Sequence, residues 1–98
     1  MSHSLRVLIV DDSDDDARLV VRHLQKGGYT LQWERVENKD VMKAALEHQP
    51  WDVILCDFKM PNFSAPEALK LVQDMQRDIP FIIVSGVIVE DAAVTAMK

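Results

Sequence analysis

Short apolar runs alternate with longer stretches in which apolar residues recur at helical spacing. Three runs of four or five residues, each followed by polar or turn residues, are typical of strands buried on both faces of a parallel sheet. They lie at 6–10, 53–56 and 81–84. A further segment, 31–34, alternates apolar and polar residues, which predicts a strand with one wetter face at an outer position of the sheet.

Helical patterns fill the stretches between these strands. In the first of them, apolar residues recur every three or four positions over 17–24, and Ser13 is a good N-cap. The acidic run 14–16 occupies the first turn, where negative charge suits the helix dipole. Gly27 and Gly28 predict the end of this helix.

Three more helices are expected from capping residues and apolar stripes. One starts at Asn38 or Asp40, and one at Ser64 or Ala65. The last begins at Glu90 and Asp91, with Ala93, Ala96 and Met97 on one face, and runs to Lys98. The alternation of four strands and four helices predicts an α/β fold with parallel strands and right-handed crossovers.

Size, charge and cysteine content limit the kinds of protein to which this chain can belong. The 98 residues suit a single domain, 1–98, and the net charge of −5 argues against a nucleic-acid-binding surface. No apolar run approaches the roughly 20 residues of a transmembrane helix, and we expect no signal peptide before the first strand. The single cysteine, Cys56, lies within a strand and suits a buried apolar role. We therefore expect a cytoplasmic protein with no membrane partner.

Carboxylates follow two of the buried strands. Asp11 and Asp12 end the first, and Asp57 ends the third. Parallel neighbours would bring the three together at one sheet edge, where open α/β sheets bind ligands. Like charges about 4 Å apart repel by roughly 1 to 4 kcal/mol, so such a cluster needs a cation or a raised pKa. Carboxylate and phosphate oxygens suit Mg²⁺, and we interpret the cluster as a Mg²⁺ pocket beside a phosphoryl site.

Two further residues complete the candidate site. Lys59 follows Asp57 by two positions, and its backbone carbonyl can face the same metal. Ser85 ends the fourth strand, and its hydroxyl could donate to a phosphoryl oxygen at the rim of the pocket. On its own Ser85 is better explained as a turn serine, and only the neighbouring aspartates reverse this in favour of the functional interpretation.

The chain resembles the receiver domain of two-component response regulators. The matching motifs are L-I-V-D-D at 8–12, D-x-x-M-P at 57–61 and the strand ending in S-G at 85–86. The resemblance implies a flavodoxin-like doubly wound parallel sheet in the order 2-1-3-4. It also implies that Asp57 accepts a phosphoryl group from a sensor histidine kinase or a phosphotransfer protein. Asp12, Asp57 and the Lys59 carbonyl would hold Mg²⁺, Asp11 would assist through water, and Ser85 would act as the switch hydroxyl.

The chain departs from the receiver pattern in two places. The loop after Pro61 reads N-F-S-A, where many relatives carry a glycine. Receivers also typically have a fifth strand and helix, which we expect to be absent from this chain. That strand carries a lysine that contacts the phosphoryl group, and Lys98 does not match it. Without this strand, 81–84 would be an open apolar edge, which predicts self-association through the fourth strand.

Three functions remain to be compared. The first is a phosphoacceptor signalling module that is not an enzyme in its own right. The second is a pseudo-receiver, a binding or scaffolding domain without effective phosphotransfer, which the missing lysine favours. The third is a phosphatase with an aspartyl-phosphate intermediate, which is disfavoured because that class has a second aspartate where Lys59 stands.

Overall fold

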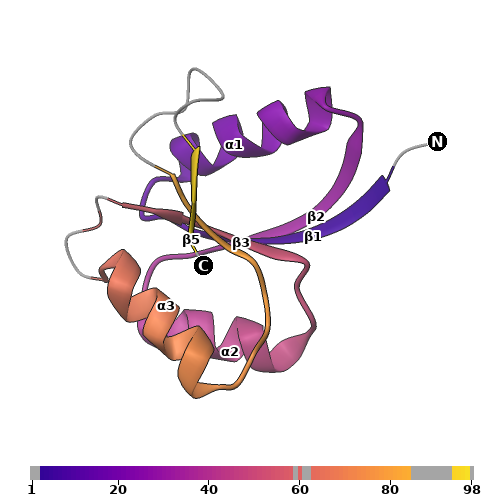
Figure 1. Ribbon diagram of the computed structural model, residues 1–98. Coiled ribbons are helices and arrows are strands. Elements are labelled where there is room, and N and C mark those ends of the chain that lie inside the picture. The colour runs from indigo at the N-terminus through magenta and orange to yellow at the C-terminus, as the bar shows by residue number, and fades with distance from the viewer. Residues whose placement is uncertain (1–2, 59, 61–62, 85–93, 98) are drawn as a thin grey trace.

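The computed structural model describes residues 3–58, 60, 63–84 and 94–97. Strands and helices alternate over most of this length (Figure 1). In chain order the elements are β1 His3–Val10, α1 Asp14–Lys26, β2 Tyr29–Val36, α2 Lys39–His48, β3 Val53–Asp57, α3 Ala65–Asp74, β4 Phe81–Val84 and β5 Val94–Met97. The four strands and first three helices expected from the sequence are therefore present.

The sheet has the strand order β2-β1-β3-β4-β5. The first four of these strands are parallel neighbours, which confirms the predicted order 2-1-3-4. Strand β2 lies at the outer position, and its residues alternate between exposed and half-buried, as predicted. The carboxyl ends of β1 and β3 therefore lie side by side, and β4 pairs along β3 up to Asp57.

Helices cover both faces of the sheet. Helix α1 packs on one face, and α2 and α3 pack on the other (Figure 1). Each face has its own apolar core. The core under α1 contains Val7, Ile9, Ala17, Val20, Val21, Leu55 and Val84. The larger core under α2 and α3 includes Leu8, Val10, Met42, Leu46, Ile54, Ala68 and Leu71. Since β1 and β3 contribute to both cores, their continuous apolar sequences are explained.

Local capping fixes where the helices begin. The side-chain oxygens of Ser13 and Asn38 accept from the backbone N–H groups three residues on, as N-caps of α1 and α2. Ser64 forms a reciprocal capping box with Glu67 at the start of α3. After α1, Gly28 has a φ of 97°, a conformation that favours glycine, and it turns the chain into β2.

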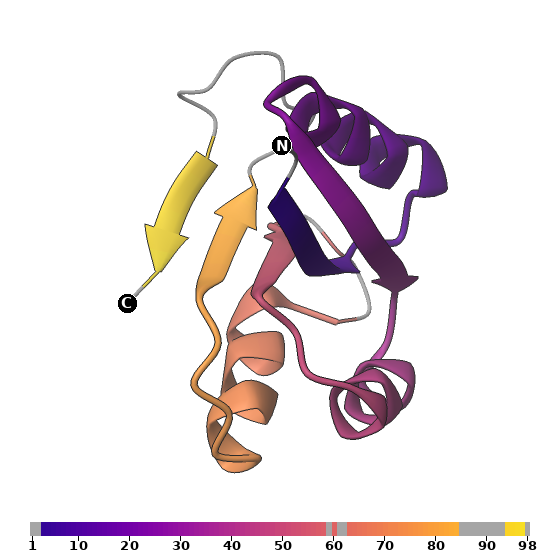
Figure 2. The ribbon, with the colours of Figure 1, turned by 90° about the vertical axis from the view of Figure 1, so that its right-hand side faces the viewer.

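The prediction of a helix over 90–98 is wrong for 94–97, the part of this segment that the structure describes. Val94–Met97 form β5, which pairs antiparallel with β4 in the register Phe81↔Met97 to Val84↔Val94 (Figure 2). The physical reason is that an unpaired β4 leaves backbone N–H and C=O groups without partners. The β-branched Val94 and Thr95 suit a strand, and a helix of this length would be marginal. Glu90, Asp91 and Ala93 lie outside the described residues.

The same pairing corrects a second expectation. Phe81–Val84 is not an open edge, because β5 occupies the position beside it (Figure 2). The predicted self-association through the fourth strand therefore loses its structural basis. Within the described ranges, no helix is long and apolar enough to cross a lipid bilayer.

Candidate functional site

The connection from β1 to α1 positions the first two aspartates. The backbone N–H of Asp11 donates to the carbonyl oxygen of Val36 at 2.9 Å, which extends the β1–β2 ladder by one residue. The Asp11 carboxylate accepts from the backbone N–H of Ser13, also at 2.9 Å. Ser13 in turn caps α1. A tight turn therefore holds Asp11 and Asp12 between the end of β1 and the start of the helix.

Asp57 lies at the carboxyl end of the neighbouring strand, β3. The next residue, Phe58, keeps its backbone in the sheet by donating its N–H to the Val84 carbonyl at 3.0 Å. Carboxylate oxygens of Asp11, Asp12 and Asp57 all lie within 4.8 Å of one another. Asp11 is buried, Asp57 is at least half-buried and Asp12 is exposed. The structure thus brings together the three carboxylates that the sequence predicted to meet.

The environment of Asp11 disfavours its negative charge. Burial is the main reason that the pKa of the Asp11 carboxyl rises from 3.8 to about 6. The hydrogen bond from Ser13 N–H acts in the opposite direction. Smaller increases come from nearby negative charges, in decreasing order those of Asp57, Asp16 and Asp12. The sequence predicted that such a cluster needs a cation or a raised pKa, and the pKa of Asp11 is raised.

The donor set suits a hard divalent cation. Three carboxylates converge within coordination reach of one centre, and oxygen ligands of this kind are those that Mg²⁺ and Ca²⁺ prefer. The exposed Asp12 leaves one side of the cluster open to solvent, and Mg²⁺ typically retains several waters beside one or two carboxylates. The residues present therefore fit Mg²⁺.

Cys56 sits beside the acidic cluster but faces the core. Its thiol is buried, and its sulfur donates to the carbonyl oxygen of Asp57 at 3.4 Å. Burial, with the charges of Asp57 and Asp11, raises the thiol pKa to about 12. A thiol so rarely ionised is a poor nucleophile and metal ligand, which agrees with its predicted packing role.

Arg35, near the end of β2, is a neighbour of the site that sequence reasoning missed. Its guanidinium donates to the backbone carbonyl of Asp11 at 3.1 Å and lies 3.6 Å from the carboxylate of Asp14. It also lies 3.8 Å from the carboxylate of Glu37. The sequence does contain a sign of this role. Leu31, Trp33 and Arg35 share the half-buried face of β2, and Arg35 is the charged residue in that otherwise apolar row.

Two predicted site residues, Lys59 and Ser85, lie outside the described residues. The structure therefore reports neither the direction of the Lys59 carbonyl nor the position of the Ser85 hydroxyl. Their predicted roles as a metal ligand and a switch hydroxyl stay predictions.

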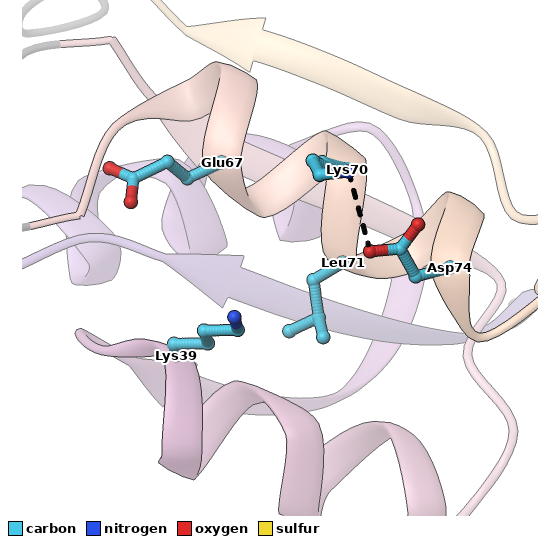
Figure 3. Close-up of a pocket in the computed structure, with 5 residues that line it drawn as sticks. All are labelled: Lys39, Glu67, Lys70, Leu71 and Asp74. Atoms are coloured by element: carbon cyan, nitrogen blue, oxygen red, sulfur yellow. Dashed lines mark ion pairs between the residues drawn. The ribbon is translucent and has the colours of Figure 1, made fainter.

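A surface pocket of about 280 Å³ lies between α2 and α3 (Figure 3). Lys39, Glu67, Lys70, Leu71 and Asp74 line it, and the Lys70 ammonium pairs with the Asp74 carboxylate at 3.8 Å. The two positive and two negative side chains that line the pocket give it no net charge. An exposed ion pair within one helix contributes little to stability. The pocket contains none of the three clustered aspartates, so we place the candidate site at the sheet edge.

Known proteins share both the sequence pattern and the fold. The family model for the response regulator receiver domain matches residues 7–98. The hydrogenase transcriptional regulatory protein HoxA of Cupriavidus necator is 36% identical over 80 residues, which are 82% of this chain and 16% of that protein. The sensor kinase CckA of Brucella abortus is 35% identical over 88 residues, or 88% of this chain and 9% of CckA. The chain thus spans a small part of these curated relatives.

Solved structures agree with this assignment. The crystal structure of a response regulator from Hahella chejuensis is 27% identical, with a TM-score of 0.70 over 91% of this chain and 69% of that one. The match of the family model over nearly the whole sequence, together with the parallel sheet and three helices, identifies the family. This chain belongs to the response regulator receiver domain family.

Proposed function

We propose that the chain is a phosphoacceptor module in which Asp57 receives a phosphoryl group. A carboxylate oxygen of Asp57 attacks the phosphorus of a phosphohistidine on a partner protein. The new P–O bond forms as the P–N bond breaks, and the released imidazole nitrogen keeps the electron pair and takes up a proton. The product is an acyl phosphate. The observation that carries the proposal is the convergence of three carboxylates at the carboxyl ends of β1 and β3.

Asp11, Asp12, Asp57 and the backbone carbonyl of Lys59 would hold Mg²⁺ beside the acceptor. In the arrangement that the family resemblance implies, Asp11 acts through a bound water. When bound, the metal neutralises charge on the transferring phosphoryl group. The protein itself holds the carboxylates in place. The β1–α1 turn fixes Asp11 and Asp12, and the pairing of β3 with β4 fixes Asp57.

Signalling would follow from the new charge on Asp57. A phosphoryl group adds about −1.5 to −2 charges next to two carboxylates, a large local change in electrostatics. We assign Ser85 the role of binding a phosphoryl oxygen and moving inward with its loop. Residues 1–98 then act as one domain that changes conformation, and no turnover of a small-molecule substrate is part of this function.

The phosphodonor is a sensor histidine kinase or a phosphotransfer protein. Regions similar to this chain occur within a protein named as a sensor kinase and within one named as a transcriptional regulator. The net charge of −5 favours a protein partner over nucleic acid. A cytoplasmic location remains the prediction made from the sequence.

Intact-protein mass after incubation with a small phosphodonor tests the proposal. A single phosphoryl adduct is expected with Mg²⁺ and is expected to disappear with a metal chelator or in Asp57→Asn. Asp52→Asn is the matched control, because Asp52 precedes the same strand at its opposite end, where it contacts Arg6. An adduct that persists in Asp57→Asn would overturn the assignment of the acceptor.

One observation favours a second candidate, the pseudo-receiver. The position beside β4, where the family resemblance expects a parallel strand with the phosphoryl-binding lysine, is occupied by the antiparallel β5. The sequence of β5, V-T-A-M, contains no lysine. Under this alternative the acidic cluster binds Mg²⁺ without accepting a phosphoryl group. Mg²⁺ binding without any adduct in the mass experiment would support it over phosphotransfer.

A further inference from the structure

Arg35 joins three backbone segments around the acidic cluster. It extends from β2, and its Nη1 donates to the carbonyl oxygen of Asp11 in the β1–α1 turn at 3.1 Å. Its Nε lies 3.6 Å from the carboxylate of Asp14 in the first turn of α1. Its side chain is only 27% exposed. A single side chain thus ties the outer strand to the segment that carries Asp11 and Asp12.

The Asp14 carboxylate is shared between two arginines. One of its oxygens accepts from Arg18 at 2.7 Å, one helical turn further along α1, and the other faces Arg35. Arg18 is mostly exposed, and its ion pair with Asp14 lies within α1. Arg35 therefore differs from Arg18 in one respect that bears on the site: it also binds the carbonyl of Asp11.

A guanidinium is well suited to holding the backbone at Asp11 in one position. A guanidinium presents several N–H donors in a rigid plane and can bind a carbonyl and a carboxylate at once, whereas an ammonium is a point charge on a flexible stem. The ion pairs that Asp14 forms with Arg18 and Arg35 would alone contribute little to stability. The hydrogen bond to the Asp11 carbonyl instead restrains the backbone directly between the two aspartates of the turn.

We propose that Arg35 is a positioning residue that holds the β1–α1 turn, and with it Asp11 and Asp12, in the geometry that binds Mg²⁺. The inference rests on the proposed function only in that the cluster binds this metal. Partners that orient metal ligands commonly change metal affinity by about 10- to 100-fold when they are removed.

The sign of the effect separates positioning from simple electrostatics. If Arg35 acted only as a nearby positive charge, its removal would make the acidic cluster more negative and Mg²⁺ would bind more tightly. If Arg35 positions the turn, its removal weakens Mg²⁺ binding. The two roles therefore give opposite results in the same titration.

The experiment is a Mg²⁺ titration by calorimetry on wild type, Arg35→Ala, Arg35→Lys and Arg18→Ala, at a temperature where all four are folded by circular dichroism. We expect Mg²⁺ affinity to fall about tenfold in Arg35→Ala and by a smaller factor in Arg35→Lys. Arg18→Ala, which removes the other partner of Asp14, should bind as wild type does. Unchanged or tighter binding in Arg35→Ala, or an equal loss in Arg18→Ala, would overturn the proposal.

A second readout does not depend on metal binding. In Mg²⁺-free protein the Ser13 amide, which donates to the Asp11 carboxylate, should exchange its proton faster in Arg35→Ala than in wild type or Arg18→Ala, as measured by NMR. Wild type that binds no Mg²⁺ would overturn the proposed function. The exchange rates would then decide whether Arg35 orders the turn, and equal rates in Arg35→Ala and wild type would overturn that as well.

Discussion

Ser13 and Asp11 are bound to each other through the backbone N–H of Ser13, which donates to the Asp11 carboxylate at 2.9 Å. The same serine uses its hydroxyl to accept from the Asp16 N–H at 3.2 Å and so begins α1. One residue thus links the start of a helix to a buried acid of the candidate site. The position of Asp11 is therefore coupled to the integrity of the first turn of α1.

Replacing Ser13 tests the cap that begins α1. In Ser13→Ala the backbone bond to Asp11 can persist, but the helix cap is lost, and we expect the free energy of unfolding to fall by about 1 kcal/mol. Urea denaturation followed by circular dichroism measures the change. Ser13→Asp retains a capping oxygen and should recover most of the loss; an equally destabilised Ser13→Asp would show that capping is not the cause.

The raised pKa of Asp11 predicts a pH dependence of stability without metal. Because the folded-state pKa of about 6 exceeds the ordinary 3.8, the folded protein binds this proton more tightly than the unfolded chain does. The contribution of Asp11 to stability is thus fully present below about pH 4 and is lost as the pH rises through 6. Denaturation midpoints between pH 4 and 7 in wild type and Asp11→Asn measure it. Identical pH profiles of the two proteins would contradict the assignment.

Mg²⁺ should stabilise the protein by binding the folded state alone. At a concentration 100 times the dissociation constant, the gain in free energy of unfolding is about 2.7 kcal/mol. We expect a rise in the thermal midpoint of wild type and a much smaller rise in Asp12→Asn, which lacks one of the three carboxylates. Differential scanning calorimetry with and without Mg²⁺ provides the comparison. An undiminished response in Asp12→Asn would remove that residue from the metal site.

The buried thiol of Cys56 should report global unfolding. With its pKa raised to about 12 by burial, almost none of the thiol is ionised at pH 8, so the folded protein should react very slowly with a thiol-reactive disulfide reagent. The reaction rate should rise with urea in parallel with the loss of helical signal. Rapid reaction in buffer alone would show that β3 opens without unfolding of the domain.

The sequence predicted the parts of the fold that depend on local pattern. The apolar runs that end at Asp11 and Asp57 place both at the carboxyl ends of buried strands, and the topology of parallel sheets then brings them together. Capping by Ser13 and Ser64 could likewise be predicted from the sequence, because each side chain and the N–H that it binds are only three residues apart.

The parts that the sequence did not predict depend on distant neighbours. The segment Val94–Met97 has residues compatible with either a helix or a strand, and its pairing with β4 is decided by an edge that lies ten or more residues away in the sequence. Arg35 resembles any polar residue near a strand end until β1 and β2 are placed side by side, which brings its guanidinium to the Asp11 carbonyl.

Locating the phosphoryl group on the chain tests the central claim most directly. After incubation with a small phosphodonor and Mg²⁺, borohydride reduction converts a phosphorylated aspartate into homoserine, which peptide sequencing by mass spectrometry locates. We expect homoserine at position 57 with Mg²⁺ and none when Mg²⁺ is chelated. Homoserine at position 11 or 12, or none at any position in protein that binds Mg²⁺, would contradict the account of Asp57 as the phosphoacceptor.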